Sequence, residues 1–441
     1  MNFFPAMRYS HGMADAERGR GAGAAAPPRL VTVNRQQIEL RPFDLESLLP
    51  PEHRARAIWA MVEGLDLTKF YEPIVARGSE PGRPAIDPKI LVALWLYATS
   101  EGVGSARELA RLCTAHDAYR WLCGGVAVNY HTLSDFRVGH EAALDALLTQ
   151  VLAAMLHRGL VQLERVAHDG MRVRASAGAA SFRRVLSLRA CLAAAEAQVA
   201  HVKAAGEHPL PGRSARAQAA AVRAARERAK RVQQALDELP AVQAVKRTAE
   251  QKAQARVSTT DPEARVMKMA DGGFRPAYNV QLATATGGRA IVGVQVTNCG
   301  SDQGQLEPML EAIAERTGTR PTEYLVDGGF VKLESLTAAA AQGVTVYAPV
   351  PEPRTAGTDR YVPKADDGPA VAAWRTRMGT EEAKAIYKER AATAETTNAD
   401  CRTHRGLDRF TVRGQTKVLC VALWTAVTYN ALRWIAAGGV T

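Results

Sequence analysis

Cysteine is scarce in this sequence of 441 residues, and its distribution excludes two common uses of the residue. The six cysteines contain no Cys-x-x-Cys pair, so neither a zinc knuckle nor a disulfide framework is indicated. The first 29 residues also lack an apolar run long enough for a signal peptide or a membrane span. We therefore expect a cytoplasmic protein with no membrane role, in which residues 1–43 are a mostly disordered tail and lead-in.

Acidic residues are fewer than basic ones. The chain has 45 aspartates and glutamates against 56 lysines and arginines, which gives a net charge of +11. A polyanion, and nucleic acid first of all, is the partner that this balance favours. With 47% hydrophobic residues, the chain can also build an ample core, and its length allows two or three domains.

Residues 44–160 have the apolar spacing of helices. Asp87 before Pro88 and Ser105 before Glu108 are helix start signals, and Thr132 is the N-cap that we expect for a later helix. This helical domain is either a helix-turn-helix DNA reader or an ordinary bundle with a solvated basic face. The arginines that would serve the first alternative are Arg107, Arg111, Arg120 and Arg137.

Residues 161–441 change to the spacing of strands, which predicts an α/β domain with a mixed sheet of five strands. Helices are expected between the later strands, at 302–317 and 333–341. The five strands are expected over 165–176, 277–284, 290–298, 323–329 and 344–350.

Residues 181–256 interrupt this domain with an alanine-rich segment that we predict to be a helical hairpin, turning near residues 208–212. The insertion holds 15 basic and 6 acidic residues, an excess of 9 out of the +11 of the whole chain. Arg216, Arg223 and Lys230 are seven residues apart and share one face. They either contact DNA or form the solvated flank of the hairpin.

Two apolar strands run into an Asp-Gly step: LERVAHDG at Asp169 and LVDGGF at Asp327. Each step alone is most often a turn or one half of a salt bridge. If the two strands are neighbours in one sheet, the two carboxylates converge and need a cation between them. Hard divalent ions suit such ligands, so we expect two Mg²⁺ ions, which Mn²⁺ can replace.

A third carboxylate lies in the segment YKERAATAETTNADCR. At 100° per residue Tyr387, Arg390, Glu395 and Arg402 fall within about 140° of arc, so they share one face of a helix. Glu395 would then be a metal ligand among groups that hold phosphates, the alternative being a surface helix with ordinary charge pairs.

These motifs, in this order, resemble the bacterial insertion-sequence transposases of the DDE type, whose catalytic domain has the ribonuclease-H-like fold. The likeness extends from LRPFDLESLLPPEHRARAIW and AYRWLCGGVAVNYHTLSDFR in the helical domain, through VAHDGMRVRASAGAASFRR, VSTTDPEARVMK and YLVDGGF, to HRGLDRFTVRGQTKV. It departs from the family in three places. Glu395 follows Arg390 by five residues instead of four, Arg402 replaces a lysine, and ATATGGRA lacks a frequent acidic residue.

The resemblance implies a metal-binding catalytic triad of Asp169, Asp327 and Glu395. It implies that Tyr387, Arg390 and Arg402 contact DNA near the active site, and we expect Arg172 or Arg174 and the basic insertion to contact phosphates. His168 would be a strand residue that orients Asp169, or else a general base.

The function implied is that of a transposase that binds terminal inverted repeats and catalyses Mg²⁺-dependent strand cleavage and strand transfer. Its partners would be double-stranded DNA, both repeat and target, and a second copy of the chain in a synaptic homodimer. Two alternatives remain: a DNA-binding protein that lost catalysis, and a metal-dependent nuclease without strand transfer.

Overall fold

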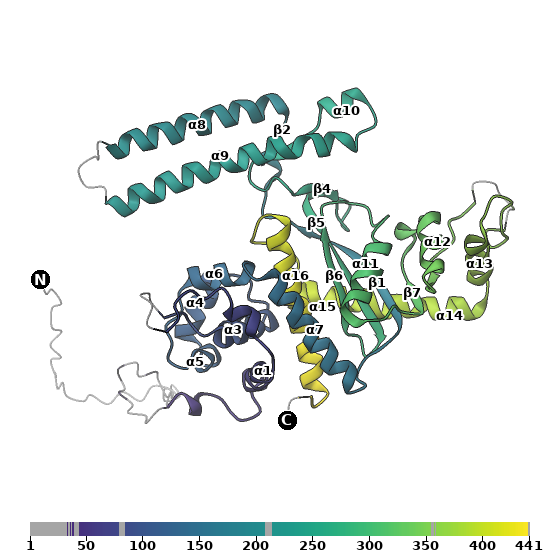
Figure 1. Ribbon diagram of the computed structural model, residues 1–441, viewed down its shortest axis with the longest axis horizontal. Helices are drawn as coiled ribbons and strands as arrows, with labels where there is room; N and C mark the ends of the chain where they lie inside the picture. Colours follow the sequence, from purple (N-terminus) through teal and green to yellow (C-terminus); the bar gives the residue numbers. More distant parts are fainter. Residues whose placement is uncertain are drawn as a thin grey trace, which may run out of the picture. The chain divides into compact units, whose positions relative to one another are not determined.

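The computed structural model describes residues 44–78, 84–207, 214–353 and 359–439, together with Val33, Gln36, Ile38 and Gly357 (Figure 1). The chain divides into two units, residues 1–43 and residues 44–441, and the helices and strands named below belong to the second. The turn expected at 208–212 and nearly all of the expected disordered tail lie outside the described residues.

The N-terminal part of this unit is helical, and two of its three predicted caps are confirmed. The Asp87 side chain accepts a hydrogen bond from the Lys89 amide, and the Ser105 side chain accepts one from the Glu108 amide. Thr132 is not an N-cap, because Asn129 starts the helix earlier and accepts from the amides of residues 131 and 132. The helices are α1 Arg54–Glu63, α2 Thr68–Tyr71, α3 Pro88–Ser100, α4 Ala106–Ala115, α5 Asp117–Cys123, α6 Tyr130–Val138 and α7 Glu141–His157.

The last helix of the chain, α16 (Gln415–Ala436), joins these helices to the sheet. It packs against α3, α6 and α7 on one side and against strand β6 on the other. The Trp424 indole donates to the Arg137 carbonyl at 3.0 Å, and the Asn430 amide pairs with both backbone groups of Ile291 at 2.8 Å. One continuous hydrophobic core therefore runs through both regions. The domain boundary at residue 160 stays a prediction.

The central sheet is mixed and contains all five predicted strands. These are β1 Gln162–Arg174, β5 Phe274–Gly287, β6 Ile291–Thr297, β7 Glu323–Leu325 and β8 Thr345–Tyr347. The order is β6-β5-β1-β7-β8, with β5 antiparallel to its neighbours and β1, β7 and β8 parallel. This order is consistent with a ribonuclease-H-like fold. A sixth strand, β4 (Arg265–Lys268), was not predicted, and it forms a hairpin with the first residues of β5.

Helices that follow the strands cover the sheet. The two predicted ones are confirmed as α11 (Leu306–Thr317) and α12 (Leu333–Ala341), whereas α13 (Pro369–Met378) was not predicted. The chain then runs along the sheet as α14 (Glu381–Arg390), a π-helical turn (Ala391–Glu395) and α15 (Thr396–His404). The π turn contacts both β1 and β5, so it brings its side chains to the central strands.

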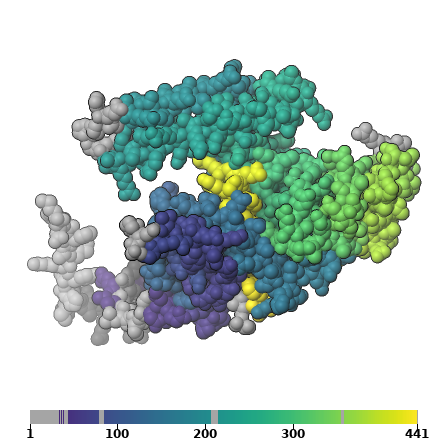
Figure 2. Space-filling model, in the orientation of Figure 1, coloured from purple at the N-terminus to yellow at the C-terminus, as the bar shows by residue number. Residues whose placement is uncertain are grey.

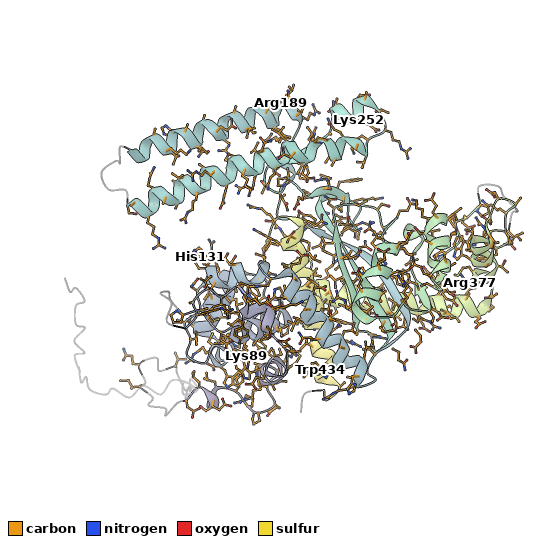
Figure 3. The ribbon with its side chains drawn as sticks, in the orientation of Figure 1. Lys89, His131, Arg189, Lys252, Arg377 and Trp434 are labelled. Atoms are coloured by element: carbon orange, nitrogen blue, oxygen red, sulfur yellow. The ribbon has the colours of Figure 1, made fainter. Side chains whose placement is uncertain are left out.

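The insertion is a helical hairpin, as predicted, made of α8 (Val185–Glu207) and α9 (Ala215–Ala244), followed by α10 (Ala249–Ala253). Strands β2 (Phe182–Arg183) and β3 (Val257–Ser258) pair at its base. A small separate core lies near the base, around Leu188 and Leu239. Figure 2 shows much of the hairpin standing clear of the N-terminal helices. Figure 3 labels two basic side chains of the insertion, Arg189 on α8 and Lys252 on α10.

Among the described residues, two helices are long and apolar enough to span a membrane by length and composition, Val185–Ala205 and Gln415–Ala436. The second is the core helix α16, most of whose window is buried. The first belongs to the hairpin.

Candidate active site

The first two aspartates occupy equivalent positions on neighbouring parallel strands. Ala167 of β1 is paired with Leu325 of β7, and Asp169 and Asp327 each follow two residues later. Since side chains alternate across a strand with a period of two, this register brings both carboxylates to the same level of the sheet. The convergence of the two Asp-Gly steps follows from this pairing.

The two steps differ in their local structure, and one expectation was wrong. Asp327 does lie just beyond the end of β7, where its Oδ1 accepts the Gly329 amide at 2.7 Å. Asp169, however, lies in the middle of β1, which continues to Arg174 because β5 pairs with it throughout this stretch. Asp169 is therefore a mid-strand residue and not a strand end.

Gly170 is required by a polar cluster on the opposite face of β1. A Cβ at this position would lie 2.1 Å from the Asp302 Oδ1 atom and 2.5 Å from the Gln281 amide nitrogen. The buried Asp302 accepts hydrogen bonds from Asn279 at 2.7 Å, from Gln281 at 2.8 Å and from Arg172 at 2.9 Å. The glycine thus lets Asp302 and its donors pack against the strand that carries Asp169.

Glu395 lies at the end of the π turn and is paired with Arg390. The Arg390 Nη2 atom donates to Glu395 Oε1 at 2.9 Å, and its Nη1 atom lies 3.8 Å from Asp169 Oδ1. The Arg390 side chain is 14% exposed, whereas the Glu395 side chain is 58% exposed. Arg390 therefore interacts with two of the three predicted triad carboxylates at once.

Asn398 and Tyr387 complete the surroundings of Asp169. The Asn398 side chain donates to Asp169 Oδ2 at 3.0 Å, and the Gly170 amide donates to Oδ1 at the same distance. Tyr387 lies beside Arg390, whose guanidinium carbon is 5.9 Å from the centre of the ring. Burial raises the pKa of the Asp169 carboxyl to about 6; Arg390 opposes the rise, and Asp327 and Asp302 add to it.

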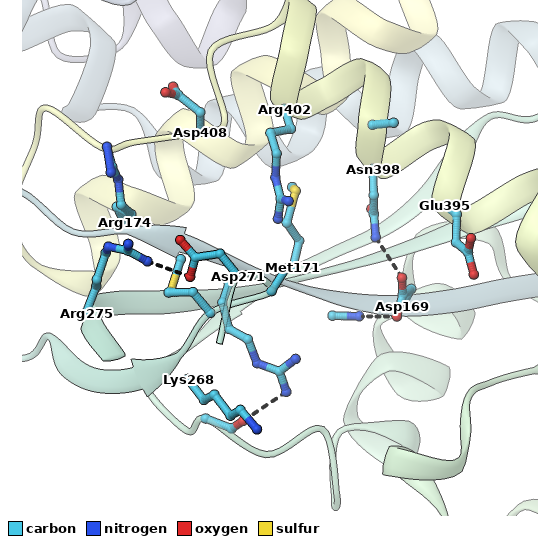
Figure 4. Close-up of a pocket in the computed structure, with 16 residues that line it drawn as sticks. Asp169, Met171, Arg174, Lys268, Asp271, Arg275, Glu395, Asn398, Arg402 and Asp408 are labelled. Carbon is cyan, nitrogen blue, oxygen red and sulfur yellow. Dashed lines mark hydrogen bonds and ion pairs between the residues drawn. The ribbon is translucent and has the colours of Figure 1, made fainter. Parts of the chain in front are cut away.

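Asp169, Asn398 and Glu395 line a cavity of about 940 Å³. Figure 4 shows Asp169, Glu395 and Asn398 together at one end of it, and Arg174, Asp271 and Arg275 at the other. Arg275 is paired with Asp271 at 2.7 Å. Three further cations that line the cavity have no ion pair among the residues described: Arg174, Lys268 and Arg402.

Asp169, Asp327 and Glu395 do not form a preformed metal cage. Within the described part of the chain, no three histidine, cysteine or acidic side chains are grouped closely enough to hold a metal ion. The ion pair with Arg390 gives the physical reason, because this guanidinium interacts with both Glu395 and Asp169.

Comparison with known proteins gives two matches to family models. Residues 43–139 match a family described as a transposase domain (DUF772), and residues 363–435 match a family described as a transposase DDE domain. Both family models support an insertion-sequence transposase of the DDE type. The second match contains Glu395 and all of α14 and α15. No curated protein and no solved structure matches the chain.

Two polar residues of this transposase have surroundings that limit their roles. His168 is fully buried between the rings of Tyr324 and Phe330, and neither ring nitrogen has a hydrogen-bond partner among the described residues. Burial lowers the pKa of His168 to about 3, and no hydrogen bond among the described residues links it to Asp169, so neither of its two expected roles is supported by its surroundings. Arg172 lines the cavity but donates to Asp302 and to the Gly300 carbonyl.

The arginines of the helical region are also mostly engaged within the transposase. Arg137 is buried and lies over the Trp95 ring at 4.8 Å, so it is not a candidate for reading DNA. Arg111 is paired with Glu108, and Arg120 with Asp117. Arg107 is 5.2 Å from the centre of the Tyr130 ring.

Two residues of the site were missed by reasoning from the sequence. Asn398 is three residues after Glu395, a spacing that puts both side chains on one face of a helix, so this signal was available. Asp302 had no such signal, because it lies 133 residues from Asp169 and meets the strand only in the folded protein, by packing against Gly170 and by accepting a hydrogen bond from Arg172.

Proposed function

We propose that this transposase binds the terminal inverted repeats of its element and catalyses Mg²⁺-dependent DNA cleavage and strand transfer. The observation that carries the proposal is the shared register of Asp169 and Asp327 on β1 and β7, with Glu395 on the same cavity as Asp169. This cavity continues past Arg402 and Arg174, whose charges suit DNA phosphates.

The three acidic residues fit a divalent cation by their chemistry. Carboxylate oxygens are the ligands that Mg²⁺ and Mn²⁺ prefer, and Asp169, Asp327 and Glu395 would hold the ions. When bound, the metal would supply Lewis-acid stabilisation of the phosphodiester oxygens and an activated water or 3′-hydroxyl. A preformed cage is not needed for this role, because a carboxylate as exposed as Glu395 can change partners from Arg390 to a cation.

Residues of the chain would prepare this chemistry. Asn398 and the Gly170 amide each hold one oxygen of Asp169, which fixes the orientation of that carboxylate. Tyr387, Arg390 and Arg402 would bind the DNA strand next to the cleaved bond. Arg174 and Lys268, which have no ion pair within the described part of the chain, would bind phosphates further along the cavity.

The remaining parts of the chain would position the DNA ends. In this proposal the helical region 44–160 recognises the terminal repeats, and the catalytic domain 161–441 carries the basic hairpin that contacts phosphates. Because an element has two ends, two copies of the chain would act together as a homodimer in a synaptic complex. The protein would work in the bacterial cytoplasm, at the nucleoid.

The test is cleavage of a duplex that carries the element's own terminal repeat, with wild type and Asp327→Asn compared in Mg²⁺ and in a chelator. We expect wild type alone to cut at the repeat end, and only with metal. Equal cutting by both proteins would remove Asp327 from the mechanism. Tight binding without cutting by either would favour the DNA-binding alternative, and cutting of duplexes without the repeat would favour the nuclease.

A further inference from the structure

A second, smaller cavity of about 250 Å³ adjoins the candidate active-site cavity, and the proposed function gives it no role. The two cavities share Arg174 and Arg275 in their walls. The smaller one is completed by Phe274, Pro276, Arg409 and three small alanines. A DNA strand that follows the cations of the large cavity would therefore pass its entrance.

The walls of this cavity combine an aromatic ring with guanidinium groups. Phe274 is the first residue of β5 and is 69% exposed, outside the hydrophobic cores. Arg174 and Arg409 have no ion pair within the described residues, whereas Arg275 is held by Asp271. An accessible ring beside arginines is the combination on which unstacked nucleobases bind, because every base has a π face and the phosphates need cations.

The backbone around the cavity is fixed by hydrogen bonds on both sides of the end of β1. The Ala175 amide donates to the Pro276 carbonyl at 2.9 Å, and the Phe410 amide donates to the Arg174 carbonyl at 2.8 Å. The hairpin tip is closed by the Met269 amide, which donates to the Gly273 carbonyl at 2.8 Å. Phe274 therefore lies in a segment whose backbone is held in position by hydrogen bonds.

We infer that this cavity binds one unstacked nucleobase of the DNA strand at the active site, with Phe274 as the stacking surface. The inference rests on the proposed function, since it takes the large cavity to hold DNA. Arg174 is five residues from Asp169, a distance of about 17 Å along the strand. At about 3.4 Å per nucleotide this corresponds to roughly five nucleotides from the cleaved bond.

The experiment uses the full chain and a series of terminal-repeat duplexes, each with one abasic site within roughly six nucleotides of the cleavage position. Affinity is measured by fluorescence anisotropy and cleavage by single-turnover kinetics, for wild type, Phe274→Ala and Phe274→Trp. Val266→Ala is the control, because Val266 is exposed on the paired strand β4 of the same hairpin but does not line this cavity.

We expect Phe274→Ala to weaken binding by about 5- to 150-fold, the range for loss of one base–aromatic stack. One duplex of the series lacks the base that stacks on Phe274. For that duplex, wild type and Phe274→Ala should have the same affinity. Phe274→Trp should behave as wild type, and Val266→Ala should change little at every position.

The inference is overturned if Phe274→Ala binds all duplexes as wild type does, or if its defect is the same at every abasic position. A wild type that binds the repeat but cuts none of the duplexes would contradict the proposed catalysis. Because the binding comparison does not need cleavage, it would still decide whether the cavity holds a base.

Discussion

Arg390 and Glu395 are five residues apart in sequence and joined by a hydrogen bond of 2.9 Å across a π-helical turn. In an α-helix side chains four apart share a face, whereas the wider π turn brings residues five apart into that relation. The spacing of five residues, one more than in the family motif that the sequence resembles, is therefore accommodated locally between α14 and α15. π turns are frequent at functional sites, and this one contacts the strand of Asp169.

The first prediction tests whether the π turn accommodates the spacing of five residues between Arg390 and Glu395. Deletion of the exposed Ala392 should convert the π turn into an α turn, leave Arg390 and Glu395 four apart, and keep cleavage within about tenfold of wild type. Insertion of one alanine at the same place should rotate Glu395 off the shared face and abolish cleavage. Circular dichroism checks folding and single-turnover assays check activity. Loss of cleavage in the folded deletion variant would contradict the explanation.

The second prediction concerns the competition between Arg390 and a metal ion. Arg390→Ala should bind Mn²⁺ about tenfold more tightly in the absence of DNA, because the guanidinium no longer neutralises Asp169 and Glu395. Isothermal titration calorimetry measures the affinity. Lys388→Ala, an exposed change on the same helix, is the control and should leave the affinity unchanged. If Arg390→Ala has the same Mn²⁺ affinity as wild type, Arg390 and the metal ion do not compete for these carboxylates.

The third prediction assigns Asn398 a positioning role. Asn398→Ala should lower the apparent Mg²⁺ affinity or the cleavage rate by about 10- to 100-fold, since Asp169 loses the donor that orients it. The rate is measured over a Mg²⁺ titration. Thr396→Ala, on an exposed neighbour, is the matched change and should behave as wild type. A normal Mg²⁺ dependence in Asn398→Ala would remove this role.

The fourth prediction contrasts the two glycines that follow the aspartates. Gly170→Ala forces a methyl group against Asp302 and Gln281 and should lower the free energy of unfolding by about 1–3 kcal/mol or more. Gly328→Ala meets nothing within 4 Å and should be nearly neutral. Thermal and denaturant unfolding measure the free energy of unfolding of both variants. Equal stabilities of the two variants would mean that the side chains around Asp302 move aside at little cost in free energy.

The fifth prediction concerns Lys268 and Arg402, two cations of the cavity that have no ion pair where the structure is described. Substitution of Lys268 or Arg402 by alanine should weaken DNA binding and reduce the slope of log affinity against log salt by about one for each phosphate that the variant no longer binds. Arg360→Ala is the comparison, because Arg360 is paired with Glu352 and does not line this cavity. A slope unchanged in the Lys268 and Arg402 variants would place the phosphates elsewhere.

Much of the architecture could be predicted from the sequence because it depends on neighbours along the chain. Caps such as Asp87 and Ser105 act on amides two or three residues away, and the apolar runs that form β1 and β7 are visible in their own residues. The same local rules failed where two signals competed, as when Asn129 took the capping role expected of Thr132. Strand β4 was missed because only four residues take part in it.

The sequence by itself determined which residues carry the candidate chemistry: two Asp-Gly steps on apolar strands and a glutamate among cations, in an order that resembles a transposase family. Only the tertiary structure decided how they meet. It placed Asp169 in the middle of β1 and joined Glu395 to Arg390 across a π turn. It also brought the Asn398 side chain into a hydrogen bond with Asp169. Finally, it buried the side chains of Arg137 and His168. These outcomes depend on contacts between residues far apart in sequence, where packing and desolvation outweigh the local preferences that a sequence displays.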